Sequence, residues 1–236
     1  MNFQWDPIYW LIVGPAMLIM LWAQWRVKST FAKWGRVQNS SSLEGHEVAA
    51  RLLQQFRMAD DVTIQGIQGE LTDNYNPMSN VLSLSQSTVR DESISAMAVV
   101  AHEVGHAQQD EDNSLLMRVR SGIVPLVSIG SQLGPVVFLV GLAMQSTLVT
   151  LIGLLLFATA FLFALITLPV EINASKRAMQ MLEDAGLFQD VAERRGAREV
   201  LNAAAWTYVA GMLSALFQVL YFVTLALRGQ RRGEPA

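Results

Sequence analysis

The sequence predicts a mainly α-helical, polytopic membrane protein with about four transmembrane helices and a smaller polar part that includes a β-hairpin. Hydrophobic residues make up 52% of the 236 residues and charged residues only 16%, against about 25% charged in soluble domains. Residues 121–170 form a run of 50 residues without Asp, Glu, Lys, Arg or His. Because a bilayer-spanning helix needs roughly 20 apolar residues, this run can hold two helices and a turn. A purely soluble protein is therefore excluded.

The four expected membrane segments are 8–25, 121–140, 148–168 and 203–227. The first and last coincide with further stretches that carry no charge. Tryptophan and tyrosine residues bracket the first segment at both ends, as interfacial aromatics do. Residues 1–7 contain Asp6 and no basic residue, so we expect this segment to stay as an anchor rather than to be cleaved as a signal peptide.

These segments divide the chain into five parts: a first transmembrane segment (1–25), a polar region (26–120), two transmembrane helices (121–170), a polar helix (171–199), and a last transmembrane segment with a basic tail (200–236). The two polar parts hold nine and five basic residues, and the tail holds three. By the positive-inside rule, both polar parts are expected in the cytoplasm. With four crossings the basic tail is expected on the other side of the membrane, and it is the exception to this rule.

The polar region 26–120 is expected to form a helix, a hairpin and a second helix. Ser41 and Glu44 have the spacing of a capping box, and apolar residues then recur with helical period at Ala49, Leu52, Leu53 and Phe56. Residues 62–85 alternate loosely and are interrupted by glycines and Asn76-Pro77, which suggests short strands. A helix from the cap Asp91 to about Gln109 completes the region.

Composition also excludes some partners and sites. The net charge of −3 argues against a nucleic-acid partner, because no basic excess is present to meet phosphates. Cysteine is absent, which excludes disulfides, thiolate nucleophiles and cysteine-ligated metals.

The helix expected from Asp91 to about Gln109 contains the pattern HExxH, from His102 to His106. Residues four apart lie one turn apart on the same helical face, so two imidazoles can converge on one metal ion. Glu103 can then reach a water at that metal and take its proton. Zinc suits such a site, which needs a third protein ligand and an open position.

Two residues are candidates for the third ligand. Asp112 lies six residues after His106, as in the variant HExxHxxGxxD, but Gln109 stands where that variant has its glycine. Glu171 lies 65 residues after His106, at the expected start of a helix just beyond the third membrane segment. A lone carboxylate at the mouth of a membrane helix is costly without a partner, so Glu171 is the preferred ligand.

Three stretches of the sequence resemble the membrane-bound neutral zinc metallopeptidases of bacteria, the YugP-like group. Ala101-His102-Glu103-Val104-Gly105-His106-Ala107-Gln108 resembles the signature AHEVGHAxQ, and Leu168–Ser175 resembles LPVEFNAS with Ile172 in place of Phe. Val200–Ala210 resembles the segment VLNAAALTYVA. The HtpX-like membrane zinc proteases are similar in layout, but Ser175 stands where that group has Asp.

The resemblance implies a zincin-like cytoplasmic catalytic part, with zinc bound by His102, His106 and Glu171 and with Glu103 as the base. It also implies a gluzincin-like zinc endopeptidase in the inner (plasma) membrane. Its expected partners are membrane-associated or unfolded protein substrates, the lipid bilayer and a membrane protein of unknown identity. One departure is that the family pattern LTDHYDP has Asn74 and Asn76 here in place of His and Asp. The alternative is therefore a scaffold or adaptor that keeps a metal site without turnover. A transporter is disfavoured because no charged residue lies within the spans.

Overall fold

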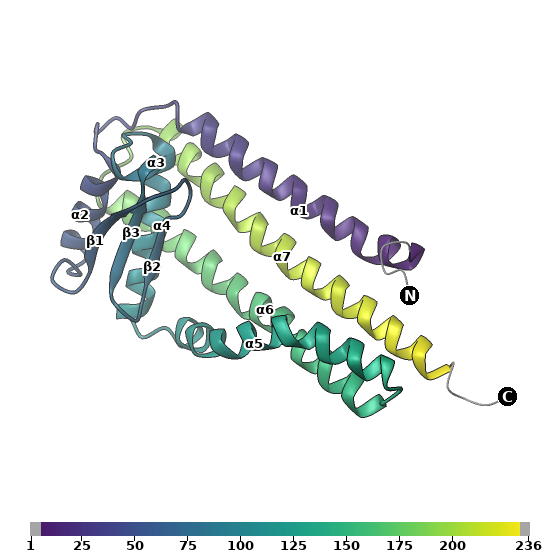
Figure 1. Cartoon of the computed structure of the whole chain (residues 1–236). Coiled ribbons are helices and arrows are strands. Elements are labelled where there is room, and N and C mark those ends of the chain that lie inside the picture. The colour runs from purple at the N-terminus through teal and green to yellow at the C-terminus, as the bar shows by residue number, and fades with distance from the viewer. Residues whose placement is uncertain (1–5, 232–236) are drawn as a thin grey trace. The chain divides into compact units, whose positions relative to one another are not determined.

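Four long helices dominate the computed structural model, which describes residues 6–231 (Figure 1). They are α1 (Pro7–Trp34), α5 (Leu115–Ala143), α6 (Thr147–Asp184) and α7 (Val191–Arg231). All four are long and apolar enough to cross a membrane. Each contains one of the segments expected from the sequence, so the prediction of a mainly helical chain with about four transmembrane helices is confirmed.

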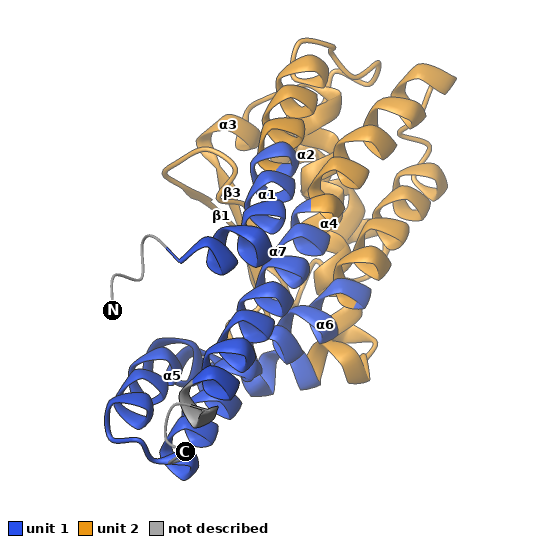
Figure 2. Cartoon of the chain, turned by 90° about the vertical axis from the view of Figure 1, so that its right-hand side faces the viewer, with its two compact units in different colours: residues 1–23, 119–169, 207–236 blue, residues 24–118, 170–206 orange. Residues whose placement is uncertain are grey.

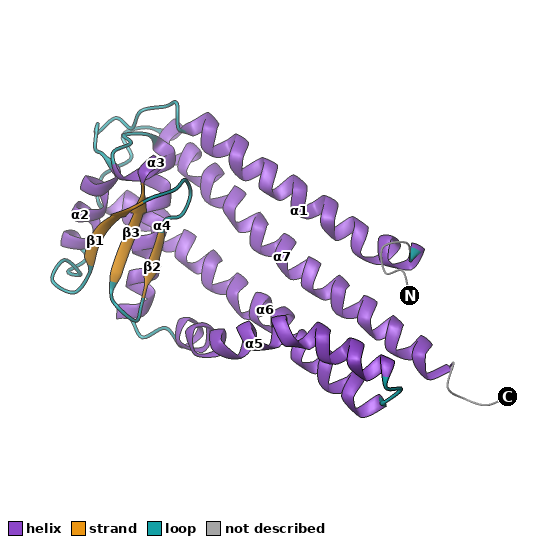
Figure 3. Cartoon of the chain, viewed as in Figure 1, coloured by secondary structure: helices purple, strands orange, loops and turns teal. Residues whose placement is uncertain are grey.

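The remaining elements are short and lie between α1 and α5 in the sequence. They are α2 (Gly45–Gln55), β1 (Thr63–Ile67), β2 (Asn74–Asn76), β3 (Val81–Ser85), α3 (Gln86–Val89) and α4 (Ile94–Glu111). Figure 3 shows the three strands side by side as one small sheet. The sheet contacts α2, α3 and α4.

The sheet has the strand order β1-β3-β2, which the sequence predicts only in part. The β2–β3 pair is the expected antiparallel hairpin, closed by a turn in which Asn80 has a φ of 53°. Strand β1, however, pairs with β3 in parallel. The link between β1 and β2 turns at Gly69 and Leu71, both at positive φ, and leaves room for β3 to pair between them. Such a parallel pairing depends on contacts distant in sequence and leaves no local signal.

Helices α2 and α4 are capped by residues other than those expected from the sequence. Glu44, not Ser41, caps α2 and forms the capping box with Glu47. Ser93, not Asp91, caps α4 by accepting from the N–H of Ala96. The Asp91 carboxylate instead accepts hydrogen bonds from the N–H and the hydroxyl of Ser93, so Asp91 supports the cap from outside the helix.

Helix α6 runs without a break through the position where a new helix was expected. Glu171 therefore lies inside a helix of 38 residues and not at a helix start, which corrects the expectation. Helix α6 ends at Asp184, and Gly186 follows with a φ of +63°, the left-handed conformation common after helix ends.

The chain forms two compact units, each assembled from separate stretches of sequence (Figure 2). Unit 1 comprises 1–23, 119–169 and 207–236, and unit 2 comprises 24–118 and 170–206. In unit 1, Phe222 stacks against Phe138 and Phe157, and Arg228 forms an ion pair with Asp6 at 3.3 Å.

Unit 2 has an apolar core built from both of its stretches. Buried residues of α2, α4 and the sheet, such as Leu52, Val104 and Leu84, pack with residues of α6 and α7 that include Met181 and Leu201. The core thus holds α4 against the polar half of α6. HExxH and Glu171 belong to these two helices.

Candidate metal centre

Two histidines of α4 and one glutamate of α6 meet in the interior of unit 2. The Nε2 atoms of His102 and His106 lie 3.1 and 3.4 Å from the same atom, Oε2 of Glu171. One ligand atom from each residue falls within a group less than 4.8 Å across. The Glu171 side chain is buried, with 1% of its surface exposed. The structure thus brings together all three residues that the sequence analysis selected as metal ligands.

Gly105 lets the two helices approach closely enough for this meeting. A Cβ atom at this position would lie 2.7 Å from the carbonyl oxygen of Ala174 on α6, well inside van der Waals contact. Gly105 lies between the two histidines in sequence, and Ala174 follows Glu171 by three residues. The absence of a side chain at Gly105 therefore sets the distance between α4 and α6 beside the three proposed ligands.

Gln109 holds Nδ1 of His106, the ring nitrogen that faces away from Glu171, and Gln109 is itself buried. The Gln109 amide nitrogen donates to the carbonyl oxygen of Val170 at 2.9 Å and to Oδ1 of Asn173 at 2.8 Å. Because both partners only accept, the amide oxygen must face His106, whose Nδ1 is 3.0 Å away. Nδ1 then carries a proton, and Nε2 is the ring nitrogen that faces Glu171.

The outer nitrogen of His102 has a different partner. Its Nδ1 lies 3.2 Å from the Ser175 hydroxyl on α6. Both histidines are thus oriented through Nδ1, and both turn Nε2 inward. Histidines that bind metals are commonly held in this way through their second ring nitrogen.

The electrostatics of Glu171 fit a bound cation. Burial by itself raises the pKa of Glu171, but hydrogen bonding to His102 and His106 outweighs burial and holds this pKa far below its usual range. Nε2 of His106 and Oε2 of Glu171 lie 3.4 Å apart, close enough for one proton or one metal ion to bind both atoms. Two imidazole nitrogens and one carboxylate oxygen are also a donor set of catalytic zinc sites.

Glu103 lies beside the cluster and is not one of its ligand groups. One carboxylate oxygen accepts a hydrogen bond of 3.0 Å from the backbone N–H of Tyr75 in β2. Burial raises the pKa of Glu103, while the neighbouring histidines His102 and His106 lower it. A carboxyl whose pKa is raised toward neutral is suited to taking and returning a proton.

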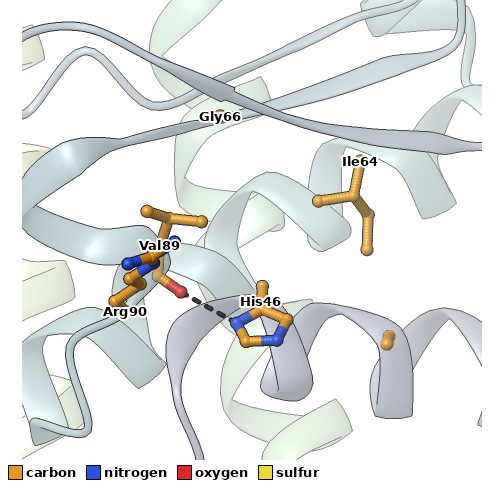
Figure 4. A pocket seen from close by; sticks show the side chains of 6 residues that line it. His46, Ile64, Gly66, Val89 and Arg90 are labelled. Carbon is orange, nitrogen blue, oxygen red and sulfur yellow. Dashed lines mark hydrogen bonds between the residues drawn. The ribbon is translucent and has the colours of Figure 1, made fainter.

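The other candidate ligands lie apart from the cluster. Asp112 is the C-cap residue of α4 and forms an ion pair with Arg177, with about half of its side chain exposed. His46, on α2, donates through Nδ1 to the carbonyl oxygen of Val89 at 3.1 Å, at a pocket that Ile64, Gly66 and Arg90 also line (Figure 4). Neither residue belongs to the His102–His106–Glu171 group.

The two departures from the family pattern lie on the exposed side of β2. Asn74 and Asn76 are exposed, whereas Tyr75 between them is half-buried. The Asn74 amide donates to the carbonyl oxygen of Thr72, and the Asn76 side-chain oxygen accepts from the N–H of Met78, a bond that an aspartate can also make. The hydrogen bonds of both asparagines are thus local to the hairpin.

Sequence reasoning missed the partners that hold the ligands. The Tyr75 N–H requires the fold of the sheet, and the sequence carries no signal for it. Gln109 and Asn173 carry a weak signal: they follow His106 and Glu171 by three and two residues, which keeps each amide within about a turn of its ligand.

The sequence comparisons decide the family. Residues 9–227 match the family model described as "Putative neutral zinc metallopeptidase". The chain belongs to this family. A relative named "Putative membrane protease YugP" from Bacillus subtilis (strain 168) is 41% identical over 215 residues, which cover 91% of this chain and 95% of that protein. No solved structure gives a significant match to the chain. The resemblance inferred from the three sequence stretches is therefore confirmed.

Proposed function

We propose that the chain is an integral-membrane zinc endopeptidase with His102, His106 and Glu171 as its metal ligands. The observation that carries this proposal is the convergence of two inward-facing Nε2 atoms on one buried carboxylate oxygen. Membership in a zinc metallopeptidase family supports zinc as the metal. When bound, zinc would supply a Lewis acid that polarises a peptide carbonyl and makes a water molecule more acidic.

Glu103 is the proposed base and acid of the reaction. Its carboxylate takes a proton from the attacking water and later gives it to the amine of the leaving product. The Tyr75 N–H fixes one carboxylate oxygen and leaves the other to exchange the proton. His102 and His106 keep their orientation through Ser175 and Gln109.

The proposed substrates are membrane-associated or unfolded proteins. Glu171 follows Leu168, the last residue of the expected third membrane segment, by three residues of one continuous helix. At 1.5 Å per residue this is a rise of only about 5 Å. A peptide cut at this level would meet the enzyme near the surface of the bilayer, on the face that the basic residues of the polar parts predict to be cytoplasmic.

Metal analysis of two variants tests the ligand assignment. Purified wild-type protein should hold about one zinc per chain, and Glu171→Gln should lose most of it because an amide is a much poorer ligand than a carboxylate. Asp112→Asn should keep its zinc. Zinc retained by Glu171→Gln and lost from Asp112→Asn would reassign the third ligand, and absence of zinc from the wild type would reject the proposal.

A scaffold without turnover remains the rival function. The rival depends on Asn74 and Asn76, whose hydrogen bonds are confined to the hairpin. A cleavable peptide, offered to the enzyme in liposomes either beside a membrane helix or on a soluble carrier, tests turnover and substrate class together. We expect faster cleavage beside the membrane helix. Equal rates would remove the membrane preference, and no cleavage of either would favour the scaffold.

A further inference from the structure

A continuous row of polar side chains connects His106 to the surface of unit 2. Gln109 accepts from His106 Nδ1 and donates to Asn173 Oδ1. The same Asn173 oxygen accepts from Arg177 Nε at 2.9 Å, and the Arg177 guanidinium pairs with Asp112. We call this row, His106–Gln109–Asn173–Arg177–Asp112, the polar ladder.

The polar ladder follows the geometry of two facing helices. His106, Gln109 and Asp112 are three residues apart along α4, so they lie on one side of that helix. Residues 170, 173 and 177 have the spacing i, i+3, i+7 and lie on one side of α6. The polar ladder therefore begins on α4 with His106 and Gln109, crosses to α6 at Asn173 and Arg177, and returns to the end of α4 at Asp112.

Each bond in the polar ladder has only one assignment of donor and acceptor. Arginine can only donate, so Asn173 must present its oxygen to Arg177. That oxygen also receives the Gln109 amide, and the Gln109 oxygen is thereby left for His106 Nδ1. Arg177 thus fixes the amide orientation of Asn173. Asn173 and the carbonyl oxygen of Val170 together fix that of Gln109, which in turn places a proton on Nδ1 of the buried His106.

We infer that Gln109, Asn173 and Arg177 are positioning residues of the metal centre, which set the tautomer and angle of His106 from outside. The inference rests on the proposed metal function and goes beyond it, since none of the three residues belongs to the ligand group. An ordinary structural role is the competing explanation. In that case Arg177 only ties α4 to α6, and its loss would lower stability without changing the affinity for zinc.

The experiment measures zinc affinity by competition with a chelator, and the visible spectrum of the Co²⁺-substituted protein. Gln109→Leu should weaken zinc binding by about 10- to 100-fold, as expected for the loss of a ligand's hydrogen-bond partner. Asn173→Leu and Arg177→Met should weaken it by about three- to tenfold. Asn173→Asp keeps the oxygen acceptor and should stay within about threefold of the wild type.

A second arginine that pairs with an acidic residue provides a matched control. Arg194 of α7 pairs with Glu183 of α6 at 2.9 Å, with both side chains about half exposed, and this pair lies outside the polar ladder. Arg194→Met should therefore leave zinc affinity and the Co²⁺ spectrum unchanged. A loss equal to that of Arg177→Met would overturn the inference.

Coupling between two variants separates positioning from stability. If Arg177 acts through Gln109, then Arg177→Met combined with Gln109→Leu should bind zinc no more weakly than Gln109→Leu alone. Additive losses, or unchanged affinity in Arg177→Met and Asn173→Leu, would reject the polar ladder while leaving the zinc site intact. If the wild type itself binds no zinc, the proposed function fails first. Asn173 and Arg177 lie toward the surface, so their variants remain informative even if Gln109→Leu does not fold.

Discussion

At the scale of single residues, Glu103 separates an enzyme from a protein that only binds a metal. Glu103→Gln keeps the size of the side chain and removes its ability to take a proton. We expect this variant to retain zinc and to lose peptidase activity by at least about 10²-fold, the usual contribution of a general base. Zinc content and cleavage rate of the same preparation check both statements. Full activity in Glu103→Gln would assign the base to another group, and loss of zinc would give Glu103 a structural role.

At the scale of secondary-structure elements, the close contact of α4 and α6 depends on Gly105. A methyl group there meets the Ala174 carbonyl oxygen at 2.7 Å, so Gly105→Ala must push the helices apart. We expect a loss of about 1–3 kcal/mol in stability, as for other overpacked sites, together with weaker zinc binding. Gly14→Ala in α1 is the control, because a Cβ there has no neighbour within 4 Å. Thermal unfolding with and without a chelator measures both effects; equal behaviour of the two variants would contradict the role of Gly105.

A second contact between elements joins the end of α1 to α7. Glu199 accepts hydrogen bonds from Lys33 at 2.7 Å and from the Trp34 indole at 2.8 Å, and these bonds lower the pKa of Glu199. A carboxyl whose pKa is lowered by folding stabilises the folded state above its unfolded pKa and loses this effect as the pH falls. Because the pair is exposed, we expect Glu199→Gln to cost less than about 1 kcal/mol at pH 7.

The pH dependence of that difference is the test. Melting temperatures of the wild type and Glu199→Gln should differ at pH 7 and converge as the pH falls below the ordinary value of 4.5 for this carboxyl. A difference that stays constant over this range would mean that Glu199 acts through packing and not through its charge.

The limits of sequence reasoning also appear at this scale. The pairing of His102 with His106 follows from one helical turn, and Glu171 follows from the cost of a lone carboxylate beside a membrane segment. The polar ladder could not be predicted, because Gln109 and Asn173 are 64 residues apart and meet only when α4 and α6 pack. The parallel pairing of β1 with β3 and the choice of Ser93 over Asp91 as a cap likewise depend on the folded surroundings.

At the scale of the whole molecule, the distribution of basic residues predicts which side of the membrane holds unit 2. Met78 is 95% exposed in the hairpin of unit 2, and Gln145 is exposed in the turn between α5 and α6. Because the chain has no cysteine, Met78→Cys and Gln145→Cys give single labelling sites without background. In intact cells an impermeant thiol reagent should label Gln145→Cys and spare Met78→Cys, and permeabilised cells should label both. The opposite pattern would move the metal centre outside the cell.

The division of unit 2 into 24–118 and 170–206 has a consequence for how the protein is made. A ribosome releases the HExxH helix long before it releases Glu171, and the charge-free run 121–170 lies between them. If these residues are the ligands, the nascent chain cannot complete a metal centre until both intervening segments have been synthesised and Glu171 has emerged. Under the proposed function, the order of synthesis then withholds peptidase activity until the first three membrane segments exist. A fragment ending before Glu171 would lack the third proposed ligand for the same reason.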